Sequence, residues 1–337
     1  MKSVSNAPLR ALNTFALPAN AAQFCQLEVT EQLPVALEQQ AASGLPLFVL
    51  GGGSNLLLTQ DLPAFVLHMA TRGKRVLEQQ GKQAIIEAEA GEAWHPFVQW
   101  TLAQGWAGLE NLSLIPGTVG AAPVQNIGAY GVELADRLHS LDAWDCQRGE
   151  QVTLLPEQCA FAYRDSCFKR EPGRWIILRV RFVLTALEHA ELAVDYGPIR
   201  QRLASVQQPT ARDVAEVVCA VRSEKLPDPA KLGNAGSFFK NPLVSAEQAQ
   251  ALLAQYPAMP HYPQAGGQVK LAAGWLIEQA GWKGHREGDA GVHREQALVL
   301  VNYGQATGAQ IFSLAQAISA DIEQRFGVAL EIEPIVI

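Results

Sequence analysis

The segment at residues 233–242, GNAGSFFKNP, places the hydroxyl of Ser237, the cation of Lys240 and the amide of Asn241 shortly after two glycines. Gly233 and Gly236 allow the backbone to take left-handed turns or to approach a ligand closely. Ser237 follows directly, and the aromatic pair Phe238–Phe239 behind it can anchor the turn in a core. The pattern fits either a reactive serine held in one position or a tight turn that closes a hairpin.

A second chemically suggestive stretch is GGGSNLLL at residues 51–58, which follows the apolar run LPLFVL. A buried strand that leads into three glycines can aim bare backbone N–H groups at a phosphate. The dinucleotide fingerprint is absent because Leu56 stands where its third glycine would be, and the lysine of a nucleoside-triphosphate loop is missing too. A purely structural turn is the alternative.

A third stretch, ENLSLIPGTVGAAPVQNIGAYG at residues 110–131, is rich in glycine and nearly free of charge. Ordering so long a loop is costly unless it wraps a ligand or crosses a domain interface. Two glycine-rich stretches with many backbone donors together predict a large, phosphate-bearing cofactor.

Composition limits the classes of function. A chain of 337 residues predicts two or three domains, and 26 basic against 33 acidic residues argue against nucleic-acid binding. Five cysteines without a CxxC pair argue against a metal site or a disulfide framework and favour a cytoplasmic protein. Neither a secretory leader nor an 18-residue apolar run is present, so we expect no membrane association.

Apolar periodicity and turn residues predict the elements that must position these stretches. Expected helices lie near residues 33–41, 94–104, 209–225, 246–255, 271–281 and 307–327. Expected strands lie near residues 45–50, 62–69, 84–91, 141–155 (a hairpin turning at Arg148–Gly149), 174–185, 296–304 and 328–337. In the final strand, Glu331 and Glu333 would share one face.

Six motifs in order, GGGSNLLL, IPGTVGAAPVQNIGAYG, YRDSCF, GNAGSFFKNP, AAGWLIEQAGWKG and LEIEP, closely resemble those of the UDP-N-acetylenolpyruvoylglucosamine reductases. The resemblance runs from about residue 13 to the C-terminus. It implies an α+β protein with an FAD-binding module of the vanillyl-alcohol-oxidase type in two subdomains (1–72 and 73–205). A substrate-binding α+β domain (206–327) would follow, with residues 328–337 packed near the first subdomain.

The resemblance also implies the reaction of these flavoenzymes, which make UDP-N-acetylmuramate for bacterial peptidoglycan. NADPH would reduce bound FAD, and UDP-N-acetylglucosamine enolpyruvate would then be reduced. Arg164 would offer a charged fork to the substrate carboxylate, and Ser237 would protonate the carbon. Glu333 would need a partner, or a raised pKa that lets it donate a hydrogen bond.

The remaining site residues carry over as ligand contacts. The resemblance implies substrate contacts at Tyr163, Tyr196, Lys225, Asn241, Lys283 and Gln296, and Tyr196 indicates the subclass with a tyrosine-bearing loop in the substrate domain. It implies cofactor contacts at Gly51, Gly52, Gly53, Ser54, Asn55, Leu56, Pro116, Gly117, Thr118, Gly120, Ala121, Gln125, Asn126, Gly128 and Gly131. We expect a monomer.

Two departures and two rival functions stay open. Ile335 stands where the family pattern leads us to expect a basic residue, and Ala121–Ala122 replace hydroxyl residues, so one hydrogen bond there must come from the backbone. Another FAD-dependent oxidoreductase of the same fold would share the glycine stretches but has no need of GNAGSFFKNP or LEIEP. A non-catalytic flavin- or nucleotide-binding module has no need of Arg164, Ser237 and Glu333 together.

Overall fold

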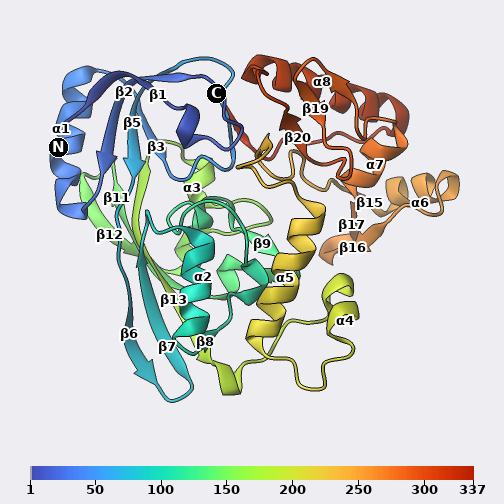
Figure 1. Ribbon diagram of the computed structural model, residues 1–337, viewed down its shortest axis with the longest axis horizontal. Helices are drawn as coiled ribbons and strands as arrows, with labels where there is room; N and C mark the ends of the chain where they lie inside the picture. The colour runs from blue at the N-terminus through green and yellow to red at the C-terminus, as the bar shows by residue number, and fades with distance from the viewer. Residues whose placement is uncertain (1) are drawn as a thin grey trace. The chain divides into compact units, whose positions relative to one another are not determined.

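The computed structural model describes residues 2–337, which form two compact units, each built from separate stretches of chain (Figure 1). Unit 1 contains residues 21–53 and 63–224 together with the N-terminal segment through Ala7. Unit 2 contains residues 8–20, 54–62 and 225–337. The glycine run is therefore divided, with residues 51–53 in unit 1 and residues 54–58 in unit 2.

The larger sheet of unit 1 has the strand order β12-β11-β13-β7-β6, and β8 also pairs with β13. Its central strand β13 (Trp175–Ala186) alternates buried and partly exposed residues along much of its length, as expected for a strand with two different faces. It pairs antiparallel with β7 (Gln83–Glu89), β8 (Trp106–Ala107) and β11 (Leu138–Asp145). The edge strands β6 (Lys74–Gln80) and β12 (Glu150–Leu154) pair antiparallel with β7 and β11, respectively.

A four-stranded sheet, in the order β1-β2-β5-β3, forms the second layer of unit 1. Its strands are β1 (Val4–Pro8), β2 (Asn20–Leu27), β3 (Leu47–Leu50) and β5 (Leu62–Met69), and β3 runs parallel to β5. Unit 1 also carries the ribbon of β9 (Gly128–Ala129) and β10 (Val132–Glu133). Its α-helices are α1 (Leu33–Ser43), α2 (Trp94–Ala103), α3 (Cys167–Arg170), α4 (Gly197–Leu203) and α5 (Ala211–Lys225). Helix α5 belongs to unit 1 as far as Glu224, and its last residue belongs to unit 2.

Unit 2 contains three small sheets and three α-helices (Figure 1). Strands β14 (Gly233–Asn234), β20 (Leu300–Asn302), β19 (Ala290–Val292) and β18 (Arg286–Glu287) follow one another in the first sheet. The second has the order β15 (Leu243–Ser245), β17 (Gln268–Leu271), β16 (His261–Pro263), and the third pairs β4 (Leu56–Leu57) with β21 (Ile335–Val336) in parallel. The helices are α6 (Ala246–Gln255), α7 (Ala273–Gln279) and α8 (Gly308–Phe326).

Helix α8 shows why the helical predictions succeeded. Thr307 and Gln310 form a reciprocal capping box at its start, and Gly327 ends it with φ of 63°. The apolar residues between these signals are buried at helical spacing, so local and tertiary preferences agree. The α+β class is confirmed, and so are the six expected helices and the hairpin of β11 and β12.

One local expectation is wrong. Residues 328–337 do not form one strand, because only β21 and an isolated bridge between Phe239 and Ile332 are paired, and Pro334 supplies no N–H. At Tyr163 and Arg164 the chain makes a tight turn closed by Ala162 and Asp165. The compact units separate after Glu224, not after residue 205, and place residues 328–337 with unit 2; the three functional subdomains stay a prediction.

Candidate functional site

The turn that carries Ser237 is fixed by Asn234, which is 3% exposed. Its side-chain oxygen accepts from the nitrogen of Gly236 at 2.9 Å, and its amide nitrogen donates to the carbonyls of Leu232 (2.8 Å) and Pro227 (3.1 Å). Gly236 has φ of 73°, a conformation that favours glycine. The side-chain amide thus sets the path of the chain immediately before the serine.

The residues after Ser237 are anchored in the core of unit 2. Phe238 and Phe239 are almost fully buried, and their rings meet edge-on with centroids 5.4 Å apart. The nitrogen of Phe238 donates to the carbonyl of Leu298 at 2.7 Å. Ser237 itself is half-buried and stands in the chain between a rigid turn and a buried aromatic pair.

Glu333 lies beside this turn in the same unit. Its main-chain nitrogen donates to the carbonyl of Phe238 at 2.9 Å, and its own carbonyl accepts from the amide of Asn55 at 3.3 Å. Lys240 forms an ion pair with Glu331 two residues earlier. The predicted proton donor and the predicted carboxyl are therefore joined through one main-chain hydrogen bond.

Two predicted substrate contacts, Asn241 and Gln296, lie at the first turn of α7. The side-chain oxygen of Asn241 accepts from the nitrogen of Ala273 at 3.0 Å, and Gln296 lies against Gly274. Because the Asn241 oxygen is used by the helix, its amide nitrogen is the atom that can serve a ligand.

The two predicted lysines lie elsewhere in unit 2. Lys283 follows the far end of α7 and forms an ion pair with Glu278 at 2.9 Å. Lys225 is the last residue of α5 and is exposed. The structure therefore groups Asn241 with Gln296 but does not bring either lysine to the first turn of α7.

Arg164 occupies a strained turn in unit 1. Its φ is 55°, which is uncommon for a residue with a side chain. A guanidinium nitrogen donates to the carbonyl of Gly128 at 2.6 Å, and the guanidinium carbon lies 5.4 Å from the ring centre of Tyr163. A Cβ at Gly128 would lie 3.1 Å from the guanidinium, so that glycine makes room for the arginine.

Gly51 and Gly52 face the glycine-rich stretch of residues 110–131 within unit 1. A Cβ at Gly52 would lie 3.0 Å from the Cα of Gly117, and one at Gly51 would lie 2.7 Å from the hydroxyl of Thr118. That hydroxyl is buried and has no hydrogen-bond partner among the described residues. A buried donor without a partner, beside close-packed bare backbone, fits a phosphate-bearing cofactor such as FAD.

The other predicted cofactor residues divide into two groups. In unit 2, Leu56 is buried in β4, and Ser54 and Asn55 directly precede it. In unit 1, the loop that faces Gly51 and Gly52 contains Pro116, Gly117 and Gly120. The short helix at Ala122–Gln125 follows Ala121 and ends at Gln125. A positive φ is found at Gly53, Asn126 and Gly131.

Asn126 has a structural role in this arrangement. It is 1% exposed, and its amide donates to Glu133 (2.7 Å) and to the carbonyl of Ala162 (3.3 Å). Its oxygen accepts from the nitrogen of Ala135 at 3.0 Å. These bonds tie the glycine-rich loop to the turn that carries Arg164, so the side chain acts on the site through the fold.

Sequence reasoning missed Arg222, which is partly buried in unit 1. Its Nε donates to the carbonyl of Leu114 at 3.3 Å, and its guanidinium hydrogen-bonds Tyr130. Burial lowers the pKa of Arg222, while Tyr130 acts in the opposite direction. The sequence does contain a signal, because Arg222 follows Val214 and Val218 at helical spacing on the buried face of α5. A charged side chain on such a face is costly unless it is paired.

Tyr196 lies beside Tyr130 in unit 1. Their rings meet edge-on with centroids 5.3 Å apart, although the Tyr196 side chain is still largely exposed. Burial raises the pKa of Tyr130. The tyrosine-bearing loop therefore belongs to unit 1, and its assignment to a substrate domain stays a prediction.

Comparison with known proteins agrees with the cofactor geometry. Residues 21–155 match the family model described as "FAD binding domain". Residues 228–337 match "UDP-N-acetylenolpyruvoylglucosamine reductase, C-terminal domain". Among the described residues no helix is both long and apolar enough to cross a membrane, and no group of three or more side chains is arranged to hold a metal ion.

Relatives with the name UDP-N-acetylenolpyruvoylglucosamine reductase match almost the whole chain. The protein of Pseudomonas putida is 62% identical over 328 residues, which cover 97% of this chain and 96% of that protein. The protein of Chromobacterium violaceum is 56% identical over 333 residues, covering 98% and 97%. The solved structure of the Thermus caldophilus reductase superposes with a TM-score of 0.69 at 26% identity, covering 99% of this chain and 98% of that one.

Proposed function

The chain belongs to the UDP-N-acetylenolpyruvoylglucosamine reductase family, and we propose that it reduces UDP-N-acetylglucosamine enolpyruvate with Ser237 as the proton donor. FAD is the bound cofactor, NADPH is the co-substrate, and the reaction is a step of peptidoglycan precursor synthesis. The chemistry supplied by bound FAD is two-electron transfer from NADPH to the enolpyruvyl double bond. We also propose that the enzyme is a cytoplasmic monomer.

One observation carries the assignment of the proton donor. Ser237 stands between a turn fixed by the side chain of Asn234 and a buried aromatic pair. The carbonyl of its neighbour Phe238 accepts a hydrogen bond from the main-chain nitrogen of Glu333. A weak acid such as serine can act only if its hydroxyl is already aimed at the carbon that takes the proton. The carbon that gains negative charge next to a carboxylate is basic enough to accept that proton.

Arg164 has the chemistry to stabilise this charge. As electrons enter the double bond, charge spreads into the substrate carboxylate as an enolate, which a fixed cation lowers in energy. The guanidinium has one nitrogen on the carbonyl of Gly128, so its orientation is set before substrate arrives. Glu333 would assist as a hydrogen-bond donor when protonated.

The remaining polar side chains would bind the parts of the substrate that do not react. Two phosphates need donors and cations, and these are the groups that six side chains provide. The proposed contacts are Tyr163, Tyr196, Lys225, Asn241, Lys283 and Gln296. Ile335, exposed in β21, supplies no charge there, so the other contacts must suffice.

A colour experiment tests the function. The purified protein is expected to be yellow from bound FAD, NADPH to bleach it without oxygen, and UDP-N-acetylglucosamine enolpyruvate to restore the colour. Bleaching without recolouring would favour a flavoprotein that acts on another substrate. A colourless protein that cannot take up FAD would contradict both functions.

A further inference from the structure

Leu114 has a backbone conformation that the sequence does not explain. Its φ is 59°, in the left-handed region that residues with branched side chains rarely adopt. Such a conformation persists only where surrounding contacts impose it, and it often marks a functional position. Leu114 lies two residues before Pro116, at the entrance to the loop that faces Gly51 and Gly52.

Two helices hold the peptide groups of Leu114 from opposite ends. Its nitrogen donates to Nδ1 of His95 on α2 at 2.9 Å, and its carbonyl accepts from Nε of Arg222 on α5 at 3.3 Å. The preceding residue, Ser113, is fully buried and donates its nitrogen to the carbonyl of Glu110 at 3.1 Å. Side chains therefore replace the regular partners of this strained residue.

We propose that His95 is a positioning residue for FAD binding, which acts by holding Leu114 in its left-handed conformation and so fixing the loop that begins at Pro116. The next residues of that loop, Gly117 and Thr118, lie against Gly52 and Gly51. The proposed action of His95 on the cofactor is indirect, because its ring accepts a hydrogen bond from the backbone nitrogen of Leu114. The proposal rests on FAD as the cofactor and not on the identity of the reduced substrate, so a failed recolouring experiment leaves it intact.

The charge state of His95 controls this contact, since Nδ1 accepts a hydrogen bond only in the neutral ring. Burial and the nearby Arg222 lower the pKa of His95, which keeps the ring neutral at pH 7. The titratable groups on the facing helix are Cys219, Glu216 and the cation of Arg222. Acid should therefore release Leu114 as the pH falls through the lowered pKa.

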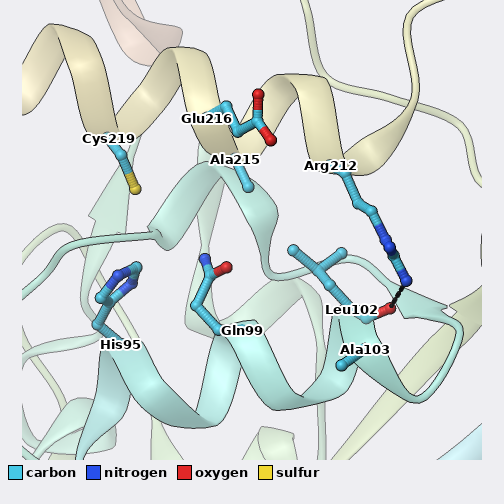
Figure 2. A pocket seen from close by; sticks show the side chains of 8 residues that line it. All are labelled: His95, Gln99, Leu102, Ala103, Arg212, Ala215, Glu216 and Cys219. Carbon is cyan, nitrogen blue, oxygen red and sulfur yellow. Dashed lines mark hydrogen bonds between the residues drawn. The ribbon is translucent and has the colours of Figure 1, made fainter.

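A cavity of about 510 Å³ beside the ring makes this testable (Figure 2). It lies between α2 and α5, with His95 opposite Cys219 at one end. At the other end Arg212 donates to the carbonyl of Leu102 at 3.3 Å. Gln99 lines the middle, one turn along α2 from His95. The space can admit water to protonate the ring, and it can admit free imidazole.

The experiment measures how fast FAD leaves the purified holoenzyme after dilution, from the rise in flavin fluorescence. His95→Ala removes the acceptor, so FAD should leave about tenfold faster, the effect of one lost hydrogen bond. His95→Asn can offer an oxygen near the position of Nδ1 and should stay within about threefold of the parent. Gln99→Ala, in the same cavity without a bond to Leu114, should match the parent.

Two further readouts separate positioning from general destabilisation. Added imidazole should slow FAD release from His95→Ala but not from Gln99→Ala. As the pH falls below 6.5 and through the lowered pKa of His95, FAD release should accelerate in the parent and stay constant in His95→Asn. The proposal is overturned if His95→Ala keeps FAD as well as the parent does, or if His95→Asn loses FAD as fast as His95→Ala. It is also overturned if the parent and His95→Asn show the same dependence of FAD release on pH. Should His95→Ala not fold, the His95→Asn profile alone decides.

Discussion

The main-chain nitrogen of Glu333 donates a hydrogen bond of 2.9 Å to the carbonyl oxygen of Phe238, the residue that follows Ser237. Asn55 holds the other side of the same peptide stretch through the Glu333 carbonyl at 3.3 Å. Three distant parts of the chain thus meet at one point of unit 2. The serine and the carboxyl are held by backbone bonds, so a side-chain variant at either position should leave the other in place.

Gly52→Ala should weaken FAD binding at least tenfold. The new methyl group would lie 3.0 Å from the Cα of Gly117, and two backbone segments cannot yield as a flexible side chain would. FAD titration of the apoprotein measures the change. Gly197→Ala, where nothing lies within 4 Å of the added carbon, is the control and should bind FAD normally. Equal affinity in both variants would show that the close approach of Gly52 to Gly117 does not shape the cofactor site.

Asn241→Asp should separate helix capping from substrate binding. The carboxylate keeps an oxygen that can accept from the nitrogen of Ala273, so the melting temperature should change little. It loses the amide donor and adds a negative charge near a diphosphate, so KM for the UDP substrate should rise at least tenfold. Steady-state kinetics and a melting curve measure both effects. An unchanged KM would confine Asn241 to a structural role.

Arg181→Met should destabilise unit 1 by about 3 kcal/mol at pH 7, because buried Asp142 loses its closest cation and buried Glu87 keeps only Arg75 among the described residues. Arg181 contacts Asp142 at 2.6 Å and Glu87 at 2.8 Å. Arg200→Met, at an exposed ion pair with Asp195, should cost less than about 1 kcal/mol. Urea unfolding followed by tryptophan fluorescence compares the variants.

The same variant should change the pH dependence of stability. Burial acts to raise the pKa of Asp142, but hydrogen bonds from Arg181 and Thr153 outweigh it and lower the pKa. In the parent, ionised Asp142 therefore stabilises the fold at pH values above its unfolded-state pKa of about 3.9. This stabilisation is lost as the pH falls through the lower pKa of the folded state. Without the hydrogen bonds from Arg181, burial should raise the pKa of Asp142. The difference in free energy of unfolding between the parent and Arg181→Met should therefore narrow from pH 7 towards pH 4. A gap independent of pH would contradict this account.

Local signals were enough to predict much of the fold. Thr307 and Gly327 bound α8, and the alternation in residues 175–186 marks β13, because local preference and burial agree there. The strand prediction for the C-terminal segment failed for the opposite reason. Its residues pair with Phe239, Leu56 and Leu57, which are far away in the sequence and which no local pattern reveals.

The candidate site shows the same division. The serine turn and the glycine stretches were visible because glycine, serine and asparagine have distinct conformational roles. The left-handed φ of Arg164 and Leu114 could not be predicted, since tertiary contacts impose it on residues that do not favour it. Arg222 was detectable only as a charge on an apolar stripe.

Ser237→Ala provides the most direct test of the proposed mechanism, because it removes the proton and leaves the turn and the Glu333 bond intact. Rapid mixing without oxygen can follow the two halves of the reaction separately by flavin absorbance. Reduction by NADPH should proceed at the parental rate, while re-oxidation by UDP-N-acetylglucosamine enolpyruvate should slow by at least a thousandfold. Equal slowing of both halves, or re-oxidation at the parental rate, would contradict Ser237 as the proton donor.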